Sequence, residues 1–250
     1  MKRLYGLVGF PLGHSFSASY FSEKFRLENT EAEYRNFPME VVDSVRNLVA
    51  ENLNLHGFNV TIPHKQAIIP FLDKLSDAAR EIGAVNVVKI FREDGKLRLL
   101  GLNTDYIGFE ESLKPLLPND CRAALVLGTG GASRAVAYAL RRLGILPQFV
   151  GRRASHEVLS YDCLNADIMR NNRLIVNCTP LGMFPDTDSV PPILWSEVCS
   201  GHLLYDLVYN PEQTKFMRMG SERGARVKNG LEMLHRQAEA AWNIWTSEKY

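Results

Sequence analysis

The chain has 250 residues, of which 46% are hydrophobic and 23% charged, so it holds enough apolar sequence for one large or two modest domains. Its 29 Lys and Arg against 28 Asp and Glu give a net charge of +1, which argues against a nucleic-acid-binding protein. Glycines and a proline interrupt the apolar N-terminal run, and no stretch reaches the ~18 apolar residues of a membrane helix, so we expect neither a signal peptide nor a membrane span. The four cysteines lack paired spacing, which predicts reduced thiols, a cytoplasmic location and no metal site.

Hydrophobic patterning predicts alternating strands and helices in the first part of the chain. The expected strands are 4–10, 34–37, 57–62, 84–91 and 97–100, and the expected helices are 17–25, 40–52, 68–72 and 77–82. Ser17 is the predicted cap of the first helix.

The alternation continues in the second part of the chain. Strands are expected at 123–127, 147–150, 174–177, 203–207 and 225–228, with one helix from Ala132 and another after Gly230 through Trp245. The sequence thus predicts an α/β fold of two domains. We place the boundary near 105–108 and expect the last helix to return to the first domain, giving domains of 1–105 plus 231–250 and of 106–230.

A glycine loop in the second part predicts a phosphate site. The apolar strand 123–127 runs into Gly128, Gly130 and Gly131, and a helix follows at once; glycines in that position let a backbone approach a pyrophosphate at a helix N-terminus. The next strand ends in Arg152 and Arg153 rather than in an acidic residue, which favours a cofactor with a 2′-phosphate, NADP. The alternative is a plain glycine turn beside two solvated arginines.

Polar residues in the first part gather near predicted strand ends and loops. They are Ser15, Ser17, Asn59, Thr61, Lys65, Asn86 and, at the domain junction, Asp105. Hydroxyls, amides, a lysine and an aspartate together suit a small polyhydroxylated substrate, and a lysine with a neighbouring aspartate can move the proton that accompanies hydride transfer. Taken singly, Lys65 could be a solvated surface lysine and Asp105 a helix cap.

Eight segments, in order along nearly the whole chain, resemble those of the shikimate dehydrogenase family. They are HSFSASYF, GFNVTIPHKQ, IGAVNVV, GLNTDYIGF, LGTGGASRAV, VNCTPLGM, YDLVYNPEQTKF and GLEMLHRQA. The resemblance implies an N-terminal α/β substrate domain, a Rossmann-like NADP domain and an active cleft between them. It also implies the reversible NADPH-dependent reduction of 3-dehydroshikimate to shikimate, in chorismate and aromatic amino-acid biosynthesis.

The resemblance also implies a role for each matching residue. Lys65 and Asp105 would be the catalytic pair. Substrate contacts would come from Ser15, Ser17, Thr61, Asn86 and Gln237, with Asn59 and Tyr209 beside them. Cofactor contacts would come from Gly128, Thr129, Gly130, Gly131, Ala132, Ser133, Arg152, Arg153, Thr179, Leu207, Gly230 and Met233. Gly151 and Arg153 replace the Asn and Thr that usually flank the arginine, and Met233 could instead be a core residue.

Two rival functions stay open at this point. The first is a quinate or quinate/shikimate dehydrogenase that uses NAD, against which the arginine pair argues. The second is a non-catalytic paralogue that senses shikimate, for which the pair of Lys65 and Asp105 would have no use. We expect a small-molecule substrate, no nucleic-acid or membrane partner, and a monomer or homodimer.

Overall fold

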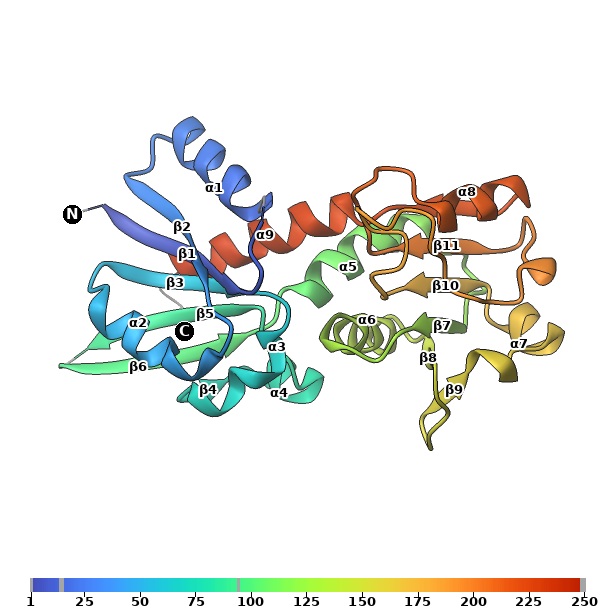
Figure 1. Cartoon of the computed structure of the whole chain (residues 1–250), viewed down its shortest axis with the longest axis horizontal. Helices are drawn as coiled ribbons and strands as arrows, with labels where there is room; N and C mark the ends of the chain where they lie inside the picture. Colours follow the sequence, from blue (N-terminus) through green and yellow to red (C-terminus); the bar gives the residue numbers. More distant parts are fainter. Residues whose placement is uncertain (1, 14–15, 94, 248–250) are drawn as a thin grey trace. The chain divides into compact units, whose positions relative to one another are not determined.

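A computed structural model describes residues 2–13, 16–93 and 95–247 of the chain. They form two compact units (Figure 1), one made of Met1–Thr104 with Ala238–Tyr250 and the other of Asp105–Gln237. We call them the first unit and the second unit. Helix α9 (Leu231–Thr246) begins in the second unit and ends in the first.

The first unit holds one six-stranded sheet in the order β2-β1-β3-β5-β6-β4. Its strands are β1 (Arg3–Gly9), β2 (Ala32–Pro38), β3 (Leu55–Val60), β4 (Lys74–Leu75), β5 (Val87–Glu93) and β6 (Lys96–Leu102). Its helices are α1 (Phe16–Leu27), α2 (Val45–Glu51), α3 (His64–Ala67) and α4 (Asp77–Ile82), with 3-10 turns η1 (Val42–Ser44) and η2 (Ile69–Phe71). Strands β2, β1 and β3 are parallel, whereas β5 is antiparallel to both β3 and β6.

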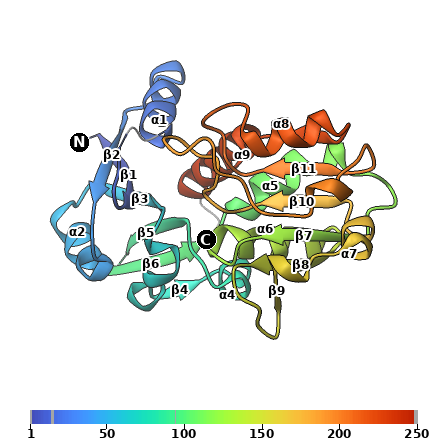
Figure 2. The same ribbon diagram turned by 45° about the vertical axis from the view of Figure 1, so that its right-hand side comes forward.

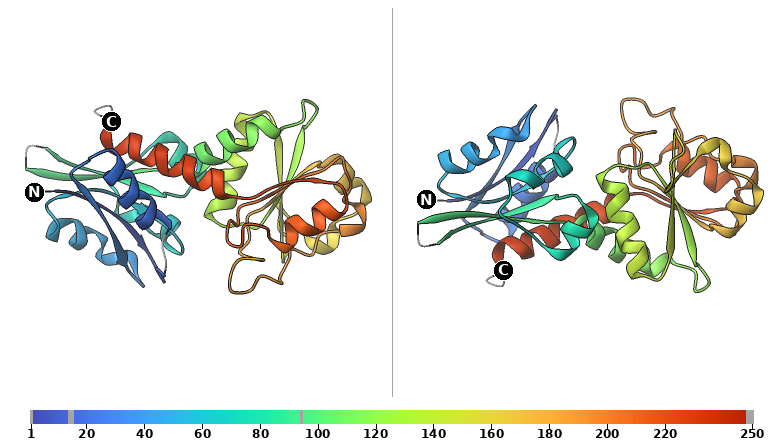
Figure 3. Two further views of the ribbon diagram at one scale, coloured as in Figure 1. Left: turned by 90° about the horizontal axis from the view of Figure 1, so that it is seen from above. Right: turned by 90° about the horizontal axis from the view of Figure 1, so that it is seen from below.

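Both faces of this sheet are buried. Alternate residues of β1 point to opposite sides of the sheet, and each set packs into a different core. Leu4 and Val8 belong to the core that packs on α2 and α4. Tyr5 and Leu7 belong to the core formed with α1 and the end of α9. The two views of Figure 3 show helices on either side of the strands.

The end of α9 is fixed to the first sheet by two polar contacts. The indole N–H of Trp245 donates to the Val88 carbonyl at 3.0 Å, and the glycine at Gly57 makes room for that indole, since a Cβ there would lie 2.4 Å from its nitrogen. The buried Lys89 amine donates to the Ile244 carbonyl at 2.8 Å, which satisfies a carbonyl that the helix end leaves open.

The second unit holds a parallel six-stranded sheet in the order β12-β11-β10-β7-β8-β9 (Figure 2). Its strands are β7 (Ala123–Leu127), β8 (Leu146–Gly151), β9 (Val158–Ser160), β10 (Leu174–Asn177), β11 (Leu203–Asp206) and β12 (Arg226–Lys228). Its helices are α5 (Asp105–Leu113), α6 (Gly131–Arg142), α7 (Ala166–Asn171), α8 (Lys215–Glu222) and the start of α9, with 3-10 turns η3 (Lys114–Leu116), η4 (Tyr161–Cys163) and η5 (Trp195–Glu197).

Helices cover both faces of this second sheet, which explains its nearly continuous apolar strands. Phe109 of α5, Val136 of α6 and Met233 of α9 share one core. Met169 of α7 and Phe216 of α8 share the other. The α/β class predicted from the sequence is therefore confirmed.

Local differences from the prediction have physical causes. Helix α1 begins at Phe16, so Ser17 lies inside its first turn and is not its cap. The helix expected at 68–72 begins instead at His64, directly after Pro63, and continues as η2. The helix expected from residue 40 begins with η1 and becomes α-helical only at Val45.

Candidate functional site

The glycine loop of the second unit has the geometry of a phosphate cradle. Gly128, after β7, has φ +109°, a conformation that favours glycine. Gly130 is the N-cap of α6 and forms no side-chain cap hydrogen bond. A Cβ built at Gly130 meets no atom within 4 Å, so nothing crowds the loop at this residue, which leads into the helix N-terminus, a favourable place for an anion.

Ser133 gives a second sign of a polar ligand at this loop. Its side chain is fully buried, and its hydroxyl faces the Cys178 thiol without a hydrogen bond of normal geometry to any described residue. It lies 3.2 Å from where a Gly128 Cβ would stand, directly behind the loop. Because buried hydroxyls are normally fully hydrogen-bonded, a weakly paired one behind the loop fits a loop that closes on a phosphate-bearing group. Thr129 and Ala132 lie beside it.

The arginine pair follows β8, the neighbour of β7 in the sheet. Arg152 and Arg153 are both exposed, and a Cβ at Gly151 would come within 3.7 Å of the Thr129 methyl. The glycine loop and the arginine turn therefore lie side by side at the carboxyl edge of the sheet. The residues present fit NADP, with the loop facing the pyrophosphate and the guanidinium groups available to a 2′-phosphate.

A buried carboxylate organises the next loops at the same edge. Asp206 accepts from the Asn177 amide at 2.9 Å, the Val208 N–H at 3.0 Å and the Thr214 hydroxyl at 2.6 Å. Burial raises the pKa of this carboxyl to about 6. Asn177 in turn accepts from the N–H and hydroxyl of Thr179, so one network fixes the loops after β10 and β11.

Three further predicted cofactor residues surround this network. Leu207 follows Asp206, and a Cβ at Gly230 would lie 2.1 Å from the Leu207 carbonyl oxygen. The two backbones therefore touch, and only glycine fits at position 230. Met233 packs in the core of the second unit with 7% of its surface exposed, whereas Tyr209 is 37% exposed in the loop after β11.

In the first unit, a hydrogen-bonded chain joins several predicted substrate residues. Asn59, at the end of β3, accepts from the Tyr34 hydroxyl at 2.8 Å and donates to the Asn86 carbonyl at 3.3 Å. The Asn86 amide donates to the Thr104 hydroxyl at 3.0 Å. The Ser17 side chain hydrogen-bonds Tyr34, whose pKa is raised by burial.

Lys65 and Thr61 lie beside this chain. Lys65 is half-buried in α3, and its carbonyl accepts the Val85 N–H at 2.7 Å, one residue before Asn86. Thr61 follows β3, and its N–H donates to the Val8 carbonyl at 2.9 Å. The buried ring of His64 contacts the Met39 carbonyl at 2.6 Å, which gives this histidine a structural partner.

Asp105 and Gln237 lie on two helices of the second unit. Asp105 is the first residue of α5, and Gln237 lies in the middle of α9; both are buried. Ser15, the other predicted substrate residue, lies outside the described residues. The structure thus gathers Ser17, Asn59, Thr61, Lys65 and Asn86 within the first unit, and the glycine loop, arginine pair, Thr179, Leu207 and Gly230 within the second.

Sequence reasoning missed Tyr34, Asn177 and Asp206, which support these residues, whereas Thr104 belongs to the polar run 103–105 that the sequence places at the domain junction. The signal available for Asn177 and Asp206 was the polar residue that ends each of two apolar strands. Tyr34 offered no such signal, because its role depends on a contact across the sheet.

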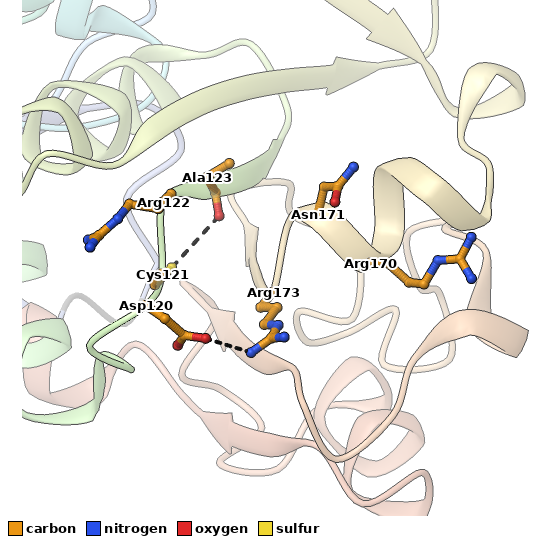
Figure 4. Close-up of a pocket in the computed structure, with 7 residues that line it drawn as sticks. All are labelled: Asp120, Cys121, Arg122, Ala123, Arg170, Asn171 and Arg173. Atoms are coloured by element: carbon orange, nitrogen blue, oxygen red, sulfur yellow. Dashed lines mark hydrogen bonds and ion pairs between the residues drawn. The ribbon is translucent and has the colours of Figure 1, made fainter.

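A surface pocket of about 180 Å³ lies at the opposite, amino-terminal edge of the second sheet (Figure 4). Arg173 pairs with Asp120 at 2.9 Å there, while Arg122 and Arg170 point away from each other. Its charged side chains do not converge on a common point, since Arg173 is paired with Asp120 and the other two arginines point apart. The pocket also lies at the opposite edge of the sheet from the carboxyl ends of the strands.

No group of three or more His, Cys, Asp or Glu side chains in the described part of the chain is placed to hold a metal ion. Among the helices described, none is long and apolar enough to cross a membrane.

The two α/β units and the glycine loop followed by arginines define the class, a nicotinamide-dependent oxidoreductase fold. Comparison with known proteins narrows this class to one family. The family model for the shikimate dehydrogenase substrate binding domain matches residues 7–88. Shikimate dehydrogenase (NADP(+)) of Desulforamulus reducens is 38% identical over 268 residues, covering 96% of this chain and 89% of the relative.

A Bacillus cereus protein of the same name is 35% identical, covering 98% of this chain and 93% of that one. The crystal structure of the Thermus thermophilus shikimate 5-dehydrogenase in complex with NADP(H) and shikimate matches with a TM-score of 0.85 and 32% identity, covering 98% of this chain and 93% of that one. The chain belongs to the shikimate dehydrogenase family, as the sequence motifs predicted.

Proposed function

We propose that this protein is an NADP-dependent shikimate dehydrogenase, which reversibly reduces 3-dehydroshikimate to shikimate in chorismate and aromatic amino-acid biosynthesis. One observation carries the proposal in a chain of this family. Lys65 and the Asn59–Asn86 chain stand at the carboxyl end of β3, while a phosphate cradle and an arginine pair stand at the carboxyl edge of the second sheet.

Lys65 and Asp105 supply the proton chemistry in this proposal. NADPH, when bound, supplies the hydride for the carbonyl carbon. The Lys65 ammonium donates a proton to the carbonyl oxygen, so that the ketone becomes an alcohol, and the neutral amine accepts that proton in the reverse direction. Asp105 orients or shares the proton.

The remaining polar side chains of the proposal bind substrate. Ser15 and Ser17 hold the carboxylate of shikimate, and Thr61, Asn86 and Gln237 hold its ring hydroxyls, with Asn59 and Tyr209 beside them. Support for Asn59 and Asn86 comes from their hydrogen bonds to Tyr34 and Thr104, because side chains already held in place lose little entropy on binding.

The cofactor contacts follow the loops of the second unit. Backbone N–H groups of residues 128–133 bind the pyrophosphate, with the Ser133 hydroxyl behind them. Arg152 and Arg153 bind the 2′-phosphate, and Thr179, Leu207, Gly230 and Met233 line the nicotinamide side. We further propose a cytoplasmic enzyme that acts as a monomer or a homodimer.

The direct test is turnover of the purified protein. Shikimate with NADP is compared with shikimate plus NAD, quinate plus NADP and quinate plus NAD, and the reduced nicotinamide is followed by absorbance. We expect turnover mainly with shikimate and NADP. A preference for NAD or quinate would identify the rival dehydrogenase, and shikimate binding without turnover in any pairing would identify a sensor.

A further inference from the structure

Helices α5 and α9 touch through their backbones at Gly108. A Cβ built at Gly108 would lie 2.4 Å from the Met233 carbonyl oxygen, 2.9 Å from the Gln237 nitrogen and 3.0 Å from the Gln237 Cβ. In an α-helix the carbonyl of residue 233 accepts the N–H of residue 237. A methyl group at position 108 would therefore collide with backbone atoms of α9, which cannot rotate away as a flexible side chain can.

The contact at Gly108 links two residues of the proposed site, Asp105 on α5 and Gln237 on α9. Asp105 lies three residues before Gly108 in α5, which places the two on the same side of the helix, one turn apart. Gln237 is itself the residue that Gly108 contacts. The separation of the two helices at Gly108 therefore sets the spacing between the Asp105 carboxylate and the Gln237 amide.

Helix α5 is fixed on its other side. The Ser112 hydroxyl lies 2.7 Å from the Gly108 carbonyl and 2.7 Å from the Tyr205 hydroxyl of β11. Phe109 packs edge-on against the Tyr205 ring with centroids 5.0 Å apart, and both side chains are fully buried. An atom added at Gly108 therefore displaces α9, and Gln237 with it, because α5 cannot retreat into the sheet.

We propose that Gly108 is a positioning residue, whose missing side chain holds Gln237 at the working distance from Asp105. The proposal rests on the proposed roles of those two residues. Ordinary van der Waals contact begins near 3.4 Å and the methyl of an alanine would stand at 2.4 Å, so α9 has to move by about 1 Å. Displacements of about 1 Å at a reacting centre cost up to about a hundredfold in rate.

The test compares Gly108→Ala with Gly220→Ala. Gly220 is also a buried helical glycine of the second unit, and a Cβ there would lie 2.6 Å from the Leu204 Cδ2. That contact lies between α8 and β11 and touches no residue of the proposed site. Both variants should melt at a lower temperature than the wild type, because both add a methyl to a packed core.

The kinetics should separate the two variants. With rates normalised to the protein that binds NADP and measured at saturating NADP, Gly108→Ala should lose ten- to a hundredfold in kcat/KM for shikimate. Gly220→Ala should keep its kcat/KM for shikimate near the wild-type value. Wild-type shikimate kinetics in Gly108→Ala, or an equal loss in Gly220→Ala, would overturn the proposal.

Ser112→Ala covers the case in which Gly108→Ala does not fold, because it adds no atom and removes the hydroxyl that joins α5 to Tyr205 and to the Gly108 carbonyl. We expect a loss of about threefold in kcat/KM for shikimate, and unchanged shikimate kinetics in this variant would then refute the positioning role. Asp105→Asn and Gln237→Ala test the underlying roles separately: if both variants keep full activity, those roles fail whatever Gly108→Ala shows.

Discussion

The raised pKa of the Asp206 carboxyl predicts that the folded protein becomes less stable as the pH rises through about 6. The pKa of its carboxyl is raised from the usual 3.8 to about 6 by burial, so between these pH values the folded protein binds more protons than the unfolded chain. The resulting stabilisation is complete below pH 3.8 and is lost as the pH rises through about 6. Two pH units of difference correspond to about 3 kcal/mol.

The assay is urea denaturation at a series of pH values for the wild type and for Asp206→Asn, which has no proton to exchange at this position. The free energy of unfolding of the wild type, minus that of the variant, should fall by about 2 kcal/mol between pH 4 and pH 7, because the unfolded Asp206 is already more than half ionised at pH 4. The subtraction removes every other titrating group that the two proteins share. A difference that stays flat, or that rises with pH, would refute the reasoning from burial.

Three further substitutions test other parts of the molecule. Lys65→Ala should lower kcat by about 10²- to 10⁴-fold while shikimate still protects against heat, because only the proton donor is lost; unchanged turnover would remove its catalytic role. Arg152→Ala should raise the KM for NADP about ten- to a hundredfold and leave the KM for NAD unchanged, since a charged hydrogen bond contributes roughly 1.5–3 kcal/mol. Arg170→Ala is its exposed control, and an equal effect on both cofactors would contradict the 2′-phosphate contact. Trp245→Phe should cost about 1–3 kcal/mol in urea denaturation, because the buried Val88 carbonyl loses its donor, and an unchanged free energy of unfolding would show that this contact contributes nothing.

The sequence predicted all the described strands except β4 and β9, because most of the strands carry long apolar runs. Strands 123–127 and 174–177 coincide with β7 and β10, where uninterrupted apolar residues leave little ambiguity. The two-residue β4 and three-residue β9 were missed, because so short a stretch carries no periodic pattern.

Helix α8 was missed for a different reason. It has eight residues and contains Gly220, which disfavours a helix by about 1 kcal/mol relative to alanine. The structure compensates with a side-chain cap from Thr214 to the Met217 N–H and with the burial of Phe216. Both the cap and the requirement for glycine opposite Leu204 become visible only once the helix lies on the sheet.

The candidate residues of the site could be selected from motifs, but their supporting contacts could not. Asn59 reaches the Asn86 carbonyl because β3 and β5 pair antiparallel with Asn59 opposite Val87. Tyr34 reaches Asn59 from β2, two strands away in the sheet. Such contacts depend on strand order and register, which a pattern of apolar residues along one chain does not encode.

In each unit, an asparagine side chain joins the ends of two neighbouring strands. Asn59 near the end of β3 and Asn177 at the end of β10 are both buried, and each amide ties its strand to the neighbouring strand end, Asn86 in one unit and Asp206 in the other. An amide can donate and accept at once without carrying charge. It therefore rigidifies the carboxyl end of a sheet and adds no charge that would compete for Lys65 or for the phosphates. A carboxylate at position 177 would lie beside the Asp206 carboxyl and repel it, whereas the Asn177 amide donates to it.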